Sequence, residues 1–310
     1  MVLRRTLLAA AGSERLRALV AGTGPARRLV GRFVAGEDIG DALEAARRLA
    51  ADDLSTSIDH LGEATAHPAQ AESATRAYLA LLDRIGDAGL ARRAEVSVKP
   101  TAVGLGLGPE GEALAAANIG RVCEAAAAHG TTVTVDMEDA AAVPATLRIV
   151  AGLRAEHPDL GCVLQSYLRR TADDLAAMAG AGARIRLCKG AYAPDPATAY
   201  TAHRDVDSAY VRHLRFLMAS DAYPMVATHD PRLIAIAGML AERAGRGPDA
   251  FEYQMLYGVR PDEQRRLAAT GARVRVYVPY GQEWYGYLAR RLAERPANVS
   301  FAARAVVTRS

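Results

Sequence analysis

AEVSVK (residues 94–99), PEGEALAAANIGRVCEAAAAH (109–129) and TTVTVD (131–136) follow one another along the chain and decide the fold. The outer two segments are short and rich in β-branched residues, which is typical of buried strands. The middle segment has the length and the apolar spacing of a helix. Strands that alternate with helices pair in parallel, so this stretch predicts one strand–helix–strand unit of a parallel sheet.

The same alternation continues on both sides of this unit. Short apolar runs predict eight strands, at residues 54–59, 94–99, 131–136, 162–167, 184–189, 224–229, 251–256 and 274–278. Helix-period segments follow at residues 69–88, 109–129, 140–156, 172–179, 206–221, 231–243, 261–270 and 282–294. Such a series indicates an α/β fold of the (β/α)8 TIM-barrel class, which ordinarily takes about 250 residues.

Two further helices are predicted before the first strand, near residues 3–20 and 25–51. They would be an addition to the barrel. No linker, low-complexity tract or repeat is visible in the 310 residues, so we expect one compact unit. Within it, residues 1–53 are predicted to form an N-terminal helical arm and residues 54–310 the barrel.

Composition and charge exclude several classes of protein. Half of the residues are hydrophobic and 24% are charged, as in ordinary globular proteins. The net charge is +3 and the cations are scattered among acids, which gives no basic face for nucleic acid. Cys123, Cys162 and Cys188 are widely spaced and are interpreted as buried small side chains, which fits a reducing cytoplasm. No apolar run approaches the roughly 18 residues that span a bilayer, and no signal peptide is recognised.

Lysine is almost absent from the chain. Of the 38 lysine and arginine residues, only Lys99 and Lys189 are lysine, and each ends a short apolar run. A lysine is a compact point charge on a thin stem, whereas arginine is a broad planar fork. A tight site at a strand end would select the lysine. The alternative is chance, with the stem lying along apolar surface.

Polar side chains gather where the predicted strands end. Because the active sites of such barrels are built at the carboxyl ends of several strands, this distribution favours a barrel over a doubly wound sheet, which gathers its chemistry at one switch point. The residues concerned are Asp59, Lys99, Asp136, Gln165, Arg186, Lys189, Thr228, His229, Tyr277 and Gln254, which lies beside Leu256.

A glycine-rich segment supports a rival interpretation. Residues 106–111, GLGPEG, fit the GxGxxG pattern of dinucleotide-binding folds, and Asp136 follows at a suitable distance. However, the first glycine of that pattern should follow its strand at once, and here several residues separate Lys99 from Gly106. Lys99 would also place a charge where that fold needs an apolar strand end. The barrel remains the preferred interpretation.

Three carboxylates in residues 136–139, DMED, close a predicted strand. They could bind a metal, cap the next helix, or neutralise Lys99 on the neighbouring strand. A buried lysine needs a counter-charge, so we favour an ion pair between Asp136 and Lys99. No set of histidine or cysteine ligands accompanies the carboxylates, and we predict no metal.

Two more segments carry candidate binding residues. Asp230 and Pro231 are expected to start a helix, which leaves Thr228 and His229 at the strand end to bind a ligand. Further on, the spacing of Tyr287, Arg290 and Arg291 puts them on one helix face. That face could simply be solvated. Together with Lys99, the two arginines would form a pocket of three cations suited to a carboxylate.

In this order the segments resemble the proline dehydrogenase family of flavoenzymes, over about residues 54–300. Single pieces are weak signals, but the ordered set is highly specific. The matching pieces are SIDHLGE (57–63), VSVK (96–99), VDMED (135–139), LQSY (164–167), RLCKGAY (186–192), ATH (227–229), FEYQMLYG (251–258), VYVPYG (276–281) and YLARR (287–291).

The resemblance implies a distorted (β/α)8 barrel that holds FAD noncovalently and oxidises L-proline to Δ1-pyrroline-5-carboxylate. It implies that Lys99, Arg290 and Arg291 hold the proline carboxylate and that Glu63 pairs with Arg290. Arg186 would face the flavin N5 region, and Asp136 would support Lys99 and the catalytic geometry. The substrate ring would be walled by Tyr192, Leu256, Tyr277 and Tyr287. FAD would be held by Met137, Gln165, Lys189, Gly190, Ala191, Thr228 and His229.

Further expectations follow from the same resemblance. The chain is too short for the aldehyde dehydrogenase module of bifunctional relatives, so we expect a monofunctional enzyme that passes electrons to a quinone. We expect it in the cytoplasm. The arginine-rich N-terminal helix could touch anionic lipid at the inner face of the cell membrane, although packing against the barrel is preferred. An alternative from another class is a barrel that binds an amino acid or a phosphate without redox chemistry.

Overall fold

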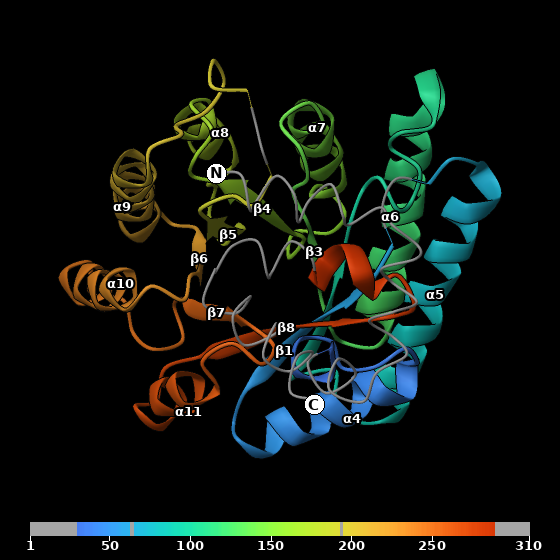
Figure 1. Ribbon diagram of the computed structural model, residues 1–310, viewed down its shortest axis with the longest axis horizontal. Coiled ribbons are helices and arrows are strands. Elements are labelled where there is room, and N and C mark those ends of the chain that lie inside the picture. The colour runs from blue at the N-terminus through green and yellow to red at the C-terminus, as the bar shows by residue number, and fades with distance from the viewer. Residues whose placement is uncertain (1–29, 63–64, 193–194, 289–310) are drawn as a thin grey trace, which may run out of the picture.

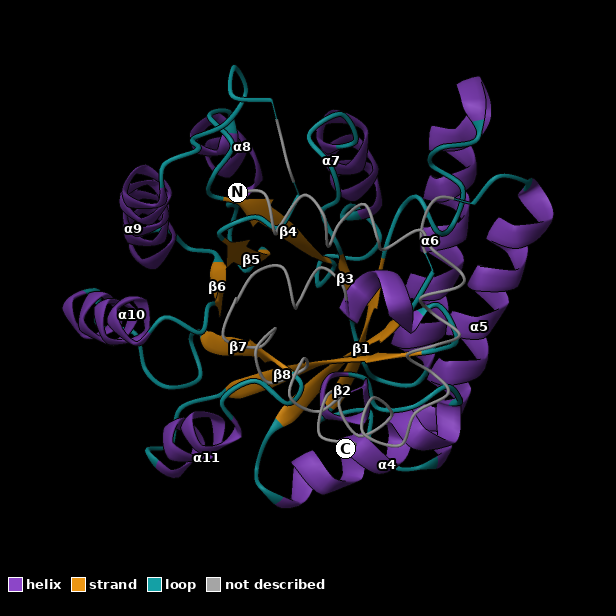
Figure 2. Ribbon diagram, in the orientation of Figure 1, coloured by secondary structure: helices purple, strands orange, loops and turns teal. Residues whose placement is uncertain are grey.

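A closed barrel of eight parallel strands forms the centre of the molecule. This computed structural model describes residues 30–62, 65–192 and 195–288. Strands pair in the order in which they occur, and β1 closes the barrel by pairing with both β2 and β8. Figures 1 and 2 show the helices as a ring around the strands. The predicted TIM-barrel class is confirmed, and a closed barrel rules out the dinucleotide-binding sheet.

Each of the eight predicted strands is present, within two residues of its expected bounds. The strands are β1 (Ser55–His60), β2 (Ala94–Val98), β3 (Val133–Val135), β4 (Gly161–Gln165), β5 (Arg184–Cys188), β6 (Tyr223–Ala227), β7 (Glu252–Leu256) and β8 (Val274–Tyr280). They are short and almost wholly buried, because helices cover their outer faces and neighbouring side chains fill the barrel.

The helices also lie close to their predicted positions. They are α4 (Ile39–Ala51), α5 (Pro68–Asp87), α6 (Gly111–Ala128), α7 (Val143–Leu153), α8 (Thr171–Met178), α9 (His203–Ala219), α10 (Pro231–Arg243) and α11 (Pro261–Ala269), with a 3-10 turn η1 (Gly108–Glu110) before α6. As predicted, Asp230 caps α10 by accepting a hydrogen bond from the backbone N–H of Arg232, and Pro231 is the first helical residue. Helix α7 begins later than expected because Asp139 accepts bonds from the amides of Ala141 and Ala142 in a turn before it.

The predicted helix over residues 25–51 is confirmed over α4, but it is not continuous within the described residues. A helical segment over residues 30–33 is separated from α4 by a bend. Gly36 has a φ of +152°, and the carboxylate of Asp41 accepts bonds from the amides of Glu37 and Asp38. These bonds satisfy the free N–H groups at the start of α4, so a new helix begins here.

Helix α4 packs against β1 and β8 and completes the ring between α11 and α5 (Figure 1). Because α4 fills this gap in the ring, the described segment that follows β8 does not pack there. Residues 284–288 begin a helix in which Trp284, Tyr287 and Leu288 pack with Leu61, just beyond the carboxyl end of β1. Residues 284–288 therefore lie near the carboxyl end of β1. The division of the chain into an arm over residues 1–53 and a barrel over 54–310 stays a prediction.

The apolar core lies between the strands and the ring of helices. Outward-facing side chains such as Ile58, Val96, Ile185 and Val276 are fully buried there. Alternate residues of the same strands point into the barrel, because successive side chains of a strand face opposite ways. In this chain those inward positions are mostly polar or charged, although branched apolar residues usually fill such barrels.

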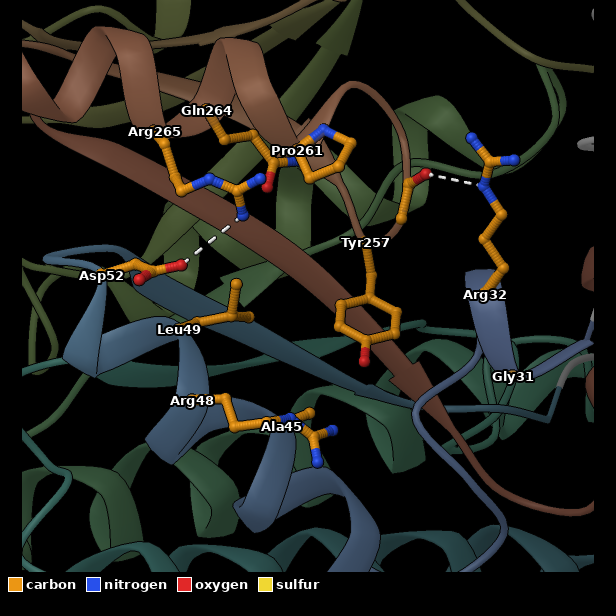
Figure 3. Close-up of a pocket in the computed structure, with 11 residues that line it drawn as sticks. Gly31, Arg32, Ala45, Arg48, Leu49, Asp52, Tyr257, Pro261, Gln264 and Arg265 are labelled. Carbon is orange, nitrogen blue, oxygen red and sulfur yellow. Dashed lines mark hydrogen bonds and ion pairs between the residues drawn. The ribbon is translucent and has the colours of Figure 1, made fainter. Parts of the chain in front are cut away.

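A pocket of about 290 Å³ lies outside the barrel, between α4 and the loop from β7 to α11 (Figure 3). Its charged groups are already paired. Arg265 approaches Asp52 at 3.6 Å, Arg48 pairs with Glu44, and Arg32 Nε donates to the carbonyl of Gly258 at 3.3 Å. None of the residues predicted to bind substrate or cofactor lines it. In the part of the chain that the structure describes, no helix is long and apolar enough to cross a membrane.

Candidate active site

The carboxyl ends of four strands bring four buried charges together, which we call the mouth layer. Lys99 follows β2, and its Nζ lies 2.5 Å from Oδ2 of Asp59 on β1. Oδ2 of Asp136, after β3, is 3.9 Å from the same nitrogen. The mouth layer is Asp59, Lys99, Asp136 and Arg186, and it contains two acids and two bases.

Arg186 on β5 is held on every nitrogen. Its Nη1 donates to Asp136 at 2.6 Å and to Ser97 at 3.0 Å, and its Nη2 donates to Ser57 at 3.0 Å. Its Nε donates to Gln254 at 2.5 Å. With its guanidinium fixed by side chains from four other strand regions, Arg186 is a rigid positive charge below the mouth of the barrel.

Tyr277 on β8 covers this charge. Its ring lies over the guanidinium of Arg186, with 5.4 Å between the ring centroid and Cζ. Its hydroxyl donates to Oδ2 of Asp136 at 2.6 Å and accepts a longer bond from Lys99 at 3.4 Å. Asp136 thereby becomes the group that connects Arg186, Tyr277 and Ser97.

The predicted ion pair between Asp136 and Lys99 is present at 3.9 Å, but Asp59 lies closer to Lys99. Asp59 is the close partner of Lys99, and the oxygens of Asp136 are occupied by Arg186, Ser97 and Tyr277. The reason is the position of the strands. Lys99 follows the middle strand of three, so it has an acid on either side, and the orientation of its side chain selects β1.

A second layer of charges, which we call the deep layer, lies nearer the amino ends of the strands. Glu95 pairs with Arg184 at 2.5 Å, and Glu252 pairs with Arg275 at 2.7 Å. Glu95 also lies 3.6 Å from Nη2 of Arg186, which joins the two layers. The deep layer is Glu95, Arg184, Glu252 and Arg275, again two acids and two bases.

The two acids of the deep layer and Asp59 of the mouth layer have pKa values shifted in opposite directions. Burial raises the pKa of Glu95, but Arg184, Arg275 and Arg186 together outweigh it and hold this pKa well below its usual range. The pKa of Glu252 is also lowered, because Arg275 overcomes the effect of burial. In the mouth layer, burial raises the pKa of Asp59 to about 6, since one lysine compensates it only in part.

Backbone and side chains around β4 form a cradle beside the mouth layer. Gln165 donates its amide to the carbonyls of Met137 and Glu138, at 3.2 and 2.9 Å. Its Oε1 is buried and has no hydrogen-bond partner among the described residues. Gly190, with φ +113°, lies so close to the ring of Tyr167 that a Cβ would come within 2.1 Å of it. The cradle therefore has an acceptor, Oε1 of Gln165, with no partner among the described residues. It also has a position, Gly190, where the ring of Tyr167 leaves no room for a side chain.

The ends of β5, β6 and β7 carry the other predicted binding residues. Lys189 pairs with Asp207 at 2.5 Å and approaches Asp230 at 3.4 Å. Thr228 accepts a bond from the amide of Asp230, and His229 Nε2 accepts one from the amide of Leu256 at 2.9 Å. Ala191 and Tyr192 are half-buried after β5. The predicted set thus follows three adjacent strands at one end of the barrel.

Three predicted residues, Glu63, Arg290 and Arg291, lie outside the described residues, so the pocket of three cations stays a prediction. Tyr287 is described and is buried, in the apolar cluster that contains Leu61. Glu138 turns out to have a structural role. It accepts bonds from the amide and hydroxyl of Thr101, which fixes the loop after β2.

Sequence reasoning missed most of the polar interior, although a signal for it exists. Residues 95, 97 and 99 are polar, and 96 and 98 are apolar. The same alternation occurs at residues 184–187, 252–255 and 274–277. In a parallel barrel both faces of a strand are buried, so a polar residue at every second position predicts a charged interior. The missed residues are Ser57, Glu95, Ser97, Arg184, Glu252 and Arg275. The role of Asp59 as the close partner of Lys99 was also missed.

A family model described as proline dehydrogenase matches residues 42–304. The chain belongs to the proline dehydrogenase family. Proline dehydrogenase of Deinococcus radiodurans is 40% identical over 277 residues, which cover 88% of this chain and 88% of that protein. Proline dehydrogenase 1 of Bacillus subtilis is 37% identical over 276 residues, or 89% of this chain and 90% of that protein. The resemblance stated from the sequence is confirmed.

Solved structures of longer proteins share the fold. Proline utilization A from Bdellovibrio bacteriovorus, inactivated by N-propargylglycine, is 24% identical with a TM-score of 0.81 and covers 91% of this chain. A variant of proline utilization A from Bradyrhizobium japonicum is 27% identical with a TM-score of 0.73 and covers 92%. This proline dehydrogenase chain spans about a third of their lengths, 34% and 32%.

Membership of the proline dehydrogenase family implies a flavin cofactor and an electron acceptor. The cradle fits such a group. A flavin ring carries an N–H donor, and the buried Oε1 of Gln165 is an acceptor with no partner among the described residues. A buried acceptor left unpaired is costly, which favours a bound donor at this position. The absence of a side chain at Gly190 lets the ring of Tyr167 pack directly against its backbone.

Proposed function

We propose that this chain oxidises L-proline to Δ1-pyrroline-5-carboxylate, with FAD as the electron acceptor in the site and a quinone as the final acceptor. Proline loses a hydride from C5 and a proton from nitrogen, and the flavin gains two electrons. Besides membership of the family, the mouth layer is the observation that supports this proposal most. It joins a buried lysine to a fixed arginine at the end of a barrel where enzymes of this fold bind substrates.

Lys99 is the group we propose to bind the substrate carboxylate, together with Arg290 and Arg291. Charge-assisted bonds to a carboxylate fix its orientation as well as its position. Glu63 is proposed to pair with Arg290 and close the site. The ring of proline would then lie among Tyr192, Leu256, Tyr277 and Tyr287, three of which are aromatic walls that exclude water.

Met137, Gln165, Lys189, Gly190, Ala191, Thr228 and His229 are proposed to hold FAD. The bound flavin supplies the site that accepts the hydride. The protein supplies position, because hydride transfer requires the donor carbon to be held close to the acceptor. Support comes from the free acceptor of Gln165 and from the grouping of Lys189, Thr228 and His229 at the ends of β5 and β6.

Arg186 and Asp136 are the proposed catalytic residues. The nitrogens of Arg186 all have protein partners, so its contribution beside the flavin N5 region would be charge rather than a new hydrogen bond. A fixed cation favours the extra negative charge of a reduced flavin. Asp136 would keep both Arg186 and Tyr277 in place. The proposal also includes a cytoplasmic location and contact with the inner face of the cell membrane, where a quinone is reached.

The visible spectrum of the purified protein tests the proposed function. Flavin absorbance should be present, or appear after FAD is supplied, and it should bleach when L-proline is added without oxygen. Arg186→Ala should abolish the bleaching and retain binding of cyclopentanecarboxylate, a ring carboxylate that lacks the nitrogen. Protein that stays colourless with FAD, or yellow protein that L-proline does not bleach, would contradict the proposal.

A further inference from the structure

The mouth layer has one acid whose oxygens are incompletely bonded. Asp59 is fully buried, and its Oδ2 lies 2.5 Å from Nζ of Lys99. Its Oδ1 accepts a long bond from the hydroxyl of Tyr78, at 3.5 Å. The two oxygens of Asp136, in contrast, receive bonds of 2.6 to 2.8 Å from Arg186, Ser97 and Tyr277. Asp59 is therefore the less stabilised carboxylate of the two.

The charges of the mouth layer balance before any ligand binds. Lys99 already faces Asp59 at 2.5 Å and Asp136 at 3.9 Å. A substrate carboxylate at Lys99 brings a third acid to this one ammonium. Like charges that share a buried site cannot all stay ionised at low cost, so the least stabilised of them tends to take up a proton.

We propose that Asp59 takes up a proton when the carboxylate of the substrate binds at Lys99. This inference rests on the proposed function, because it assumes a carboxylate at Lys99. It assigns Asp59 as a positioning residue, which orients Lys99 in the free enzyme and gives up its charge in the complex.

Charged and titratable groups around Asp59 support this assignment. Burial raises its pKa to about 6, with Lys99 acting in the opposite direction and Asp136 in the same one. A carboxylate added beside Lys99 raises this pKa further. His60, next in the strand, has a pKa lowered by its burial and by Lys99. The groups facing Asp59 are Lys99 on β2, Asp136 after β3, Tyr78 on α5, and Tyr277 and Tyr280 on β8.

Asp136 cannot take this role without breaking the site. Its protonation would remove the acceptor of Arg186 and of Tyr277, two charge-assisted bonds. Protonated Asp59 loses only its attraction to Lys99 and can still keep its place beside Tyr78. The arrangement thus has one acid held by three close donors and one acid that can change charge.

Binding of cyclopentanecarboxylate to the flavin-loaded enzyme tests the proposal, because this probe carries the carboxylate but has no amine to titrate. Calorimetry at pH 6.5 in two buffers of different ionisation enthalpy measures the protons exchanged. We expect wild-type enzyme to take up a fraction of one proton. If binding raises the pKa of Asp59 by one unit, the probe should bind on the order of fivefold more tightly at pH 6 than at pH 8.

Asp59→Asn is the matching variant, since asparagine keeps the shape and an acceptor for Lys99. It should bind the probe without proton uptake, and with the affinity of wild-type enzyme at low pH throughout this range. Asp174→Asn is the control, because Asp174 is a buried acid on α8 paired with Arg170, outside the site. This control should keep the proton uptake of wild-type enzyme.

Several results would overturn the proposal. Binding by wild-type enzyme without proton uptake would do so directly, and this measurement needs no variant. Asp59→Asn enzyme that folds and binds the probe more weakly at every pH would show that Asp59 acts as a fixed anchor. If the enzyme oxidised L-proline but did not bind the probe, Lys99 would not be the site that binds the carboxylate. Each of these leaves the proposed function standing, whereas flavin-loaded protein that does not oxidise L-proline overturns both.

Discussion

The mouth layer and the deep layer have the same number of acids and bases, yet their surroundings differ. In the deep layer each acid meets guanidinium groups in close pairs, and the pKa values of Glu95 and Glu252 are lowered. In the mouth layer Asp59 has one lysine, and burial raises its pKa to about 6. Layers with the same number of charges therefore shift the pKa values of their acids differently. Guanidinium groups favour the ionised form of the acids in the deep layer, whereas Asp59 in the mouth layer has a pKa from which it can respond to a ligand.

Glu252→Gln should produce the largest effect on stability and a small effect on catalysis. Removing one partner of a buried pair costs about 3–5 kcal/mol, and Arg275 would keep only the more distant Glu95, at 3.8 Å, among the described acids. Chemical denaturation of the variant and wild-type protein measures this loss, and KM for L-proline should stay unchanged. A loss below about 1 kcal/mol, or a clear change in KM, would mean that the layers are not separate in function.

Asp136→Ala should produce the largest effect on catalysis. Asp136 accepts bonds from Arg186 and Tyr277, and bonds to charged groups are worth about 1.5–3 kcal/mol each. We therefore expect the rate of flavin reduction to fall by about 100-fold or more. Anaerobic stopped-flow mixing with L-proline measures this rate, and Asp174→Ala serves as the matched control. If the variant stays folded and its rate of flavin reduction falls less than threefold, Asp136 is not a catalytic residue.

The strands were predictable because their signal is local. Short apolar runs bounded by helices indicated all eight strands, and the polar strand ends indicated the face of the site. The charged interior was not foreseen, because it depends on which strand faces arrive inside a closed barrel. The closer partner of Lys99, Asp59, was missed for the same reason. In the sequence, Asp59 and Asp136 are equally good candidates to pair with Lys99. Only the arrangement of the three strands shows that Asp59 lies closer.

Local turn chemistry explains the other differences. The break before α4 depends on the backbone of Gly36 and on the carboxylate of Asp41, which cannot be recognised from apolar periodicity alone. The place of α4 in the ring depends on contacts with β1 and β8 at the far end of the chain. Periodicity predicts that a helix exists, but tertiary packing decides which gap it fills.

The pH dependence of stability distinguishes the two layers in another way. The pKa of Asp59 is raised from 3.8 in the unfolded chain to about 6, so its ionised form destabilises the native state. Wild-type stability relative to Asp59→Asn should therefore fall as pH rises from about 4 to 6 and stay level above, by up to about 3 kcal/mol. Denaturation of both proteins at pH 4, 5, 6 and 8 measures the difference, and a difference independent of pH would contradict this assignment.

Tyr277→Phe should have the smallest of these effects. The variant keeps the ring over Arg186 and loses the hydroxyl that donates to Asp136. One charge-assisted bond of about 1.5 kcal/mol corresponds to roughly a tenfold loss in kcat/KM for L-proline. Steady-state kinetics measure it, with Tyr223→Phe, a hydroxyl bonded to Glu252 in the deep layer, as control. Equal losses in both variants would contradict the separation of the layers.

A matched pair of variants, Lys99→Met and Arg184→Met, compares the two layers most directly. Both replace a buried cation beside a buried acid, at 2.5 Å from Asp59 and from Glu95 respectively. Steady-state kinetics of both variants should show KM for L-proline raised by about one to two decades in Lys99→Met alone, since a charge-assisted bond is worth about 1.5–3 kcal/mol. Arg184→Met should lose stability and keep its KM. If Lys99→Met kept the wild-type KM, or if Arg184→Met raised it as much, the carboxylate site would not be in the mouth layer.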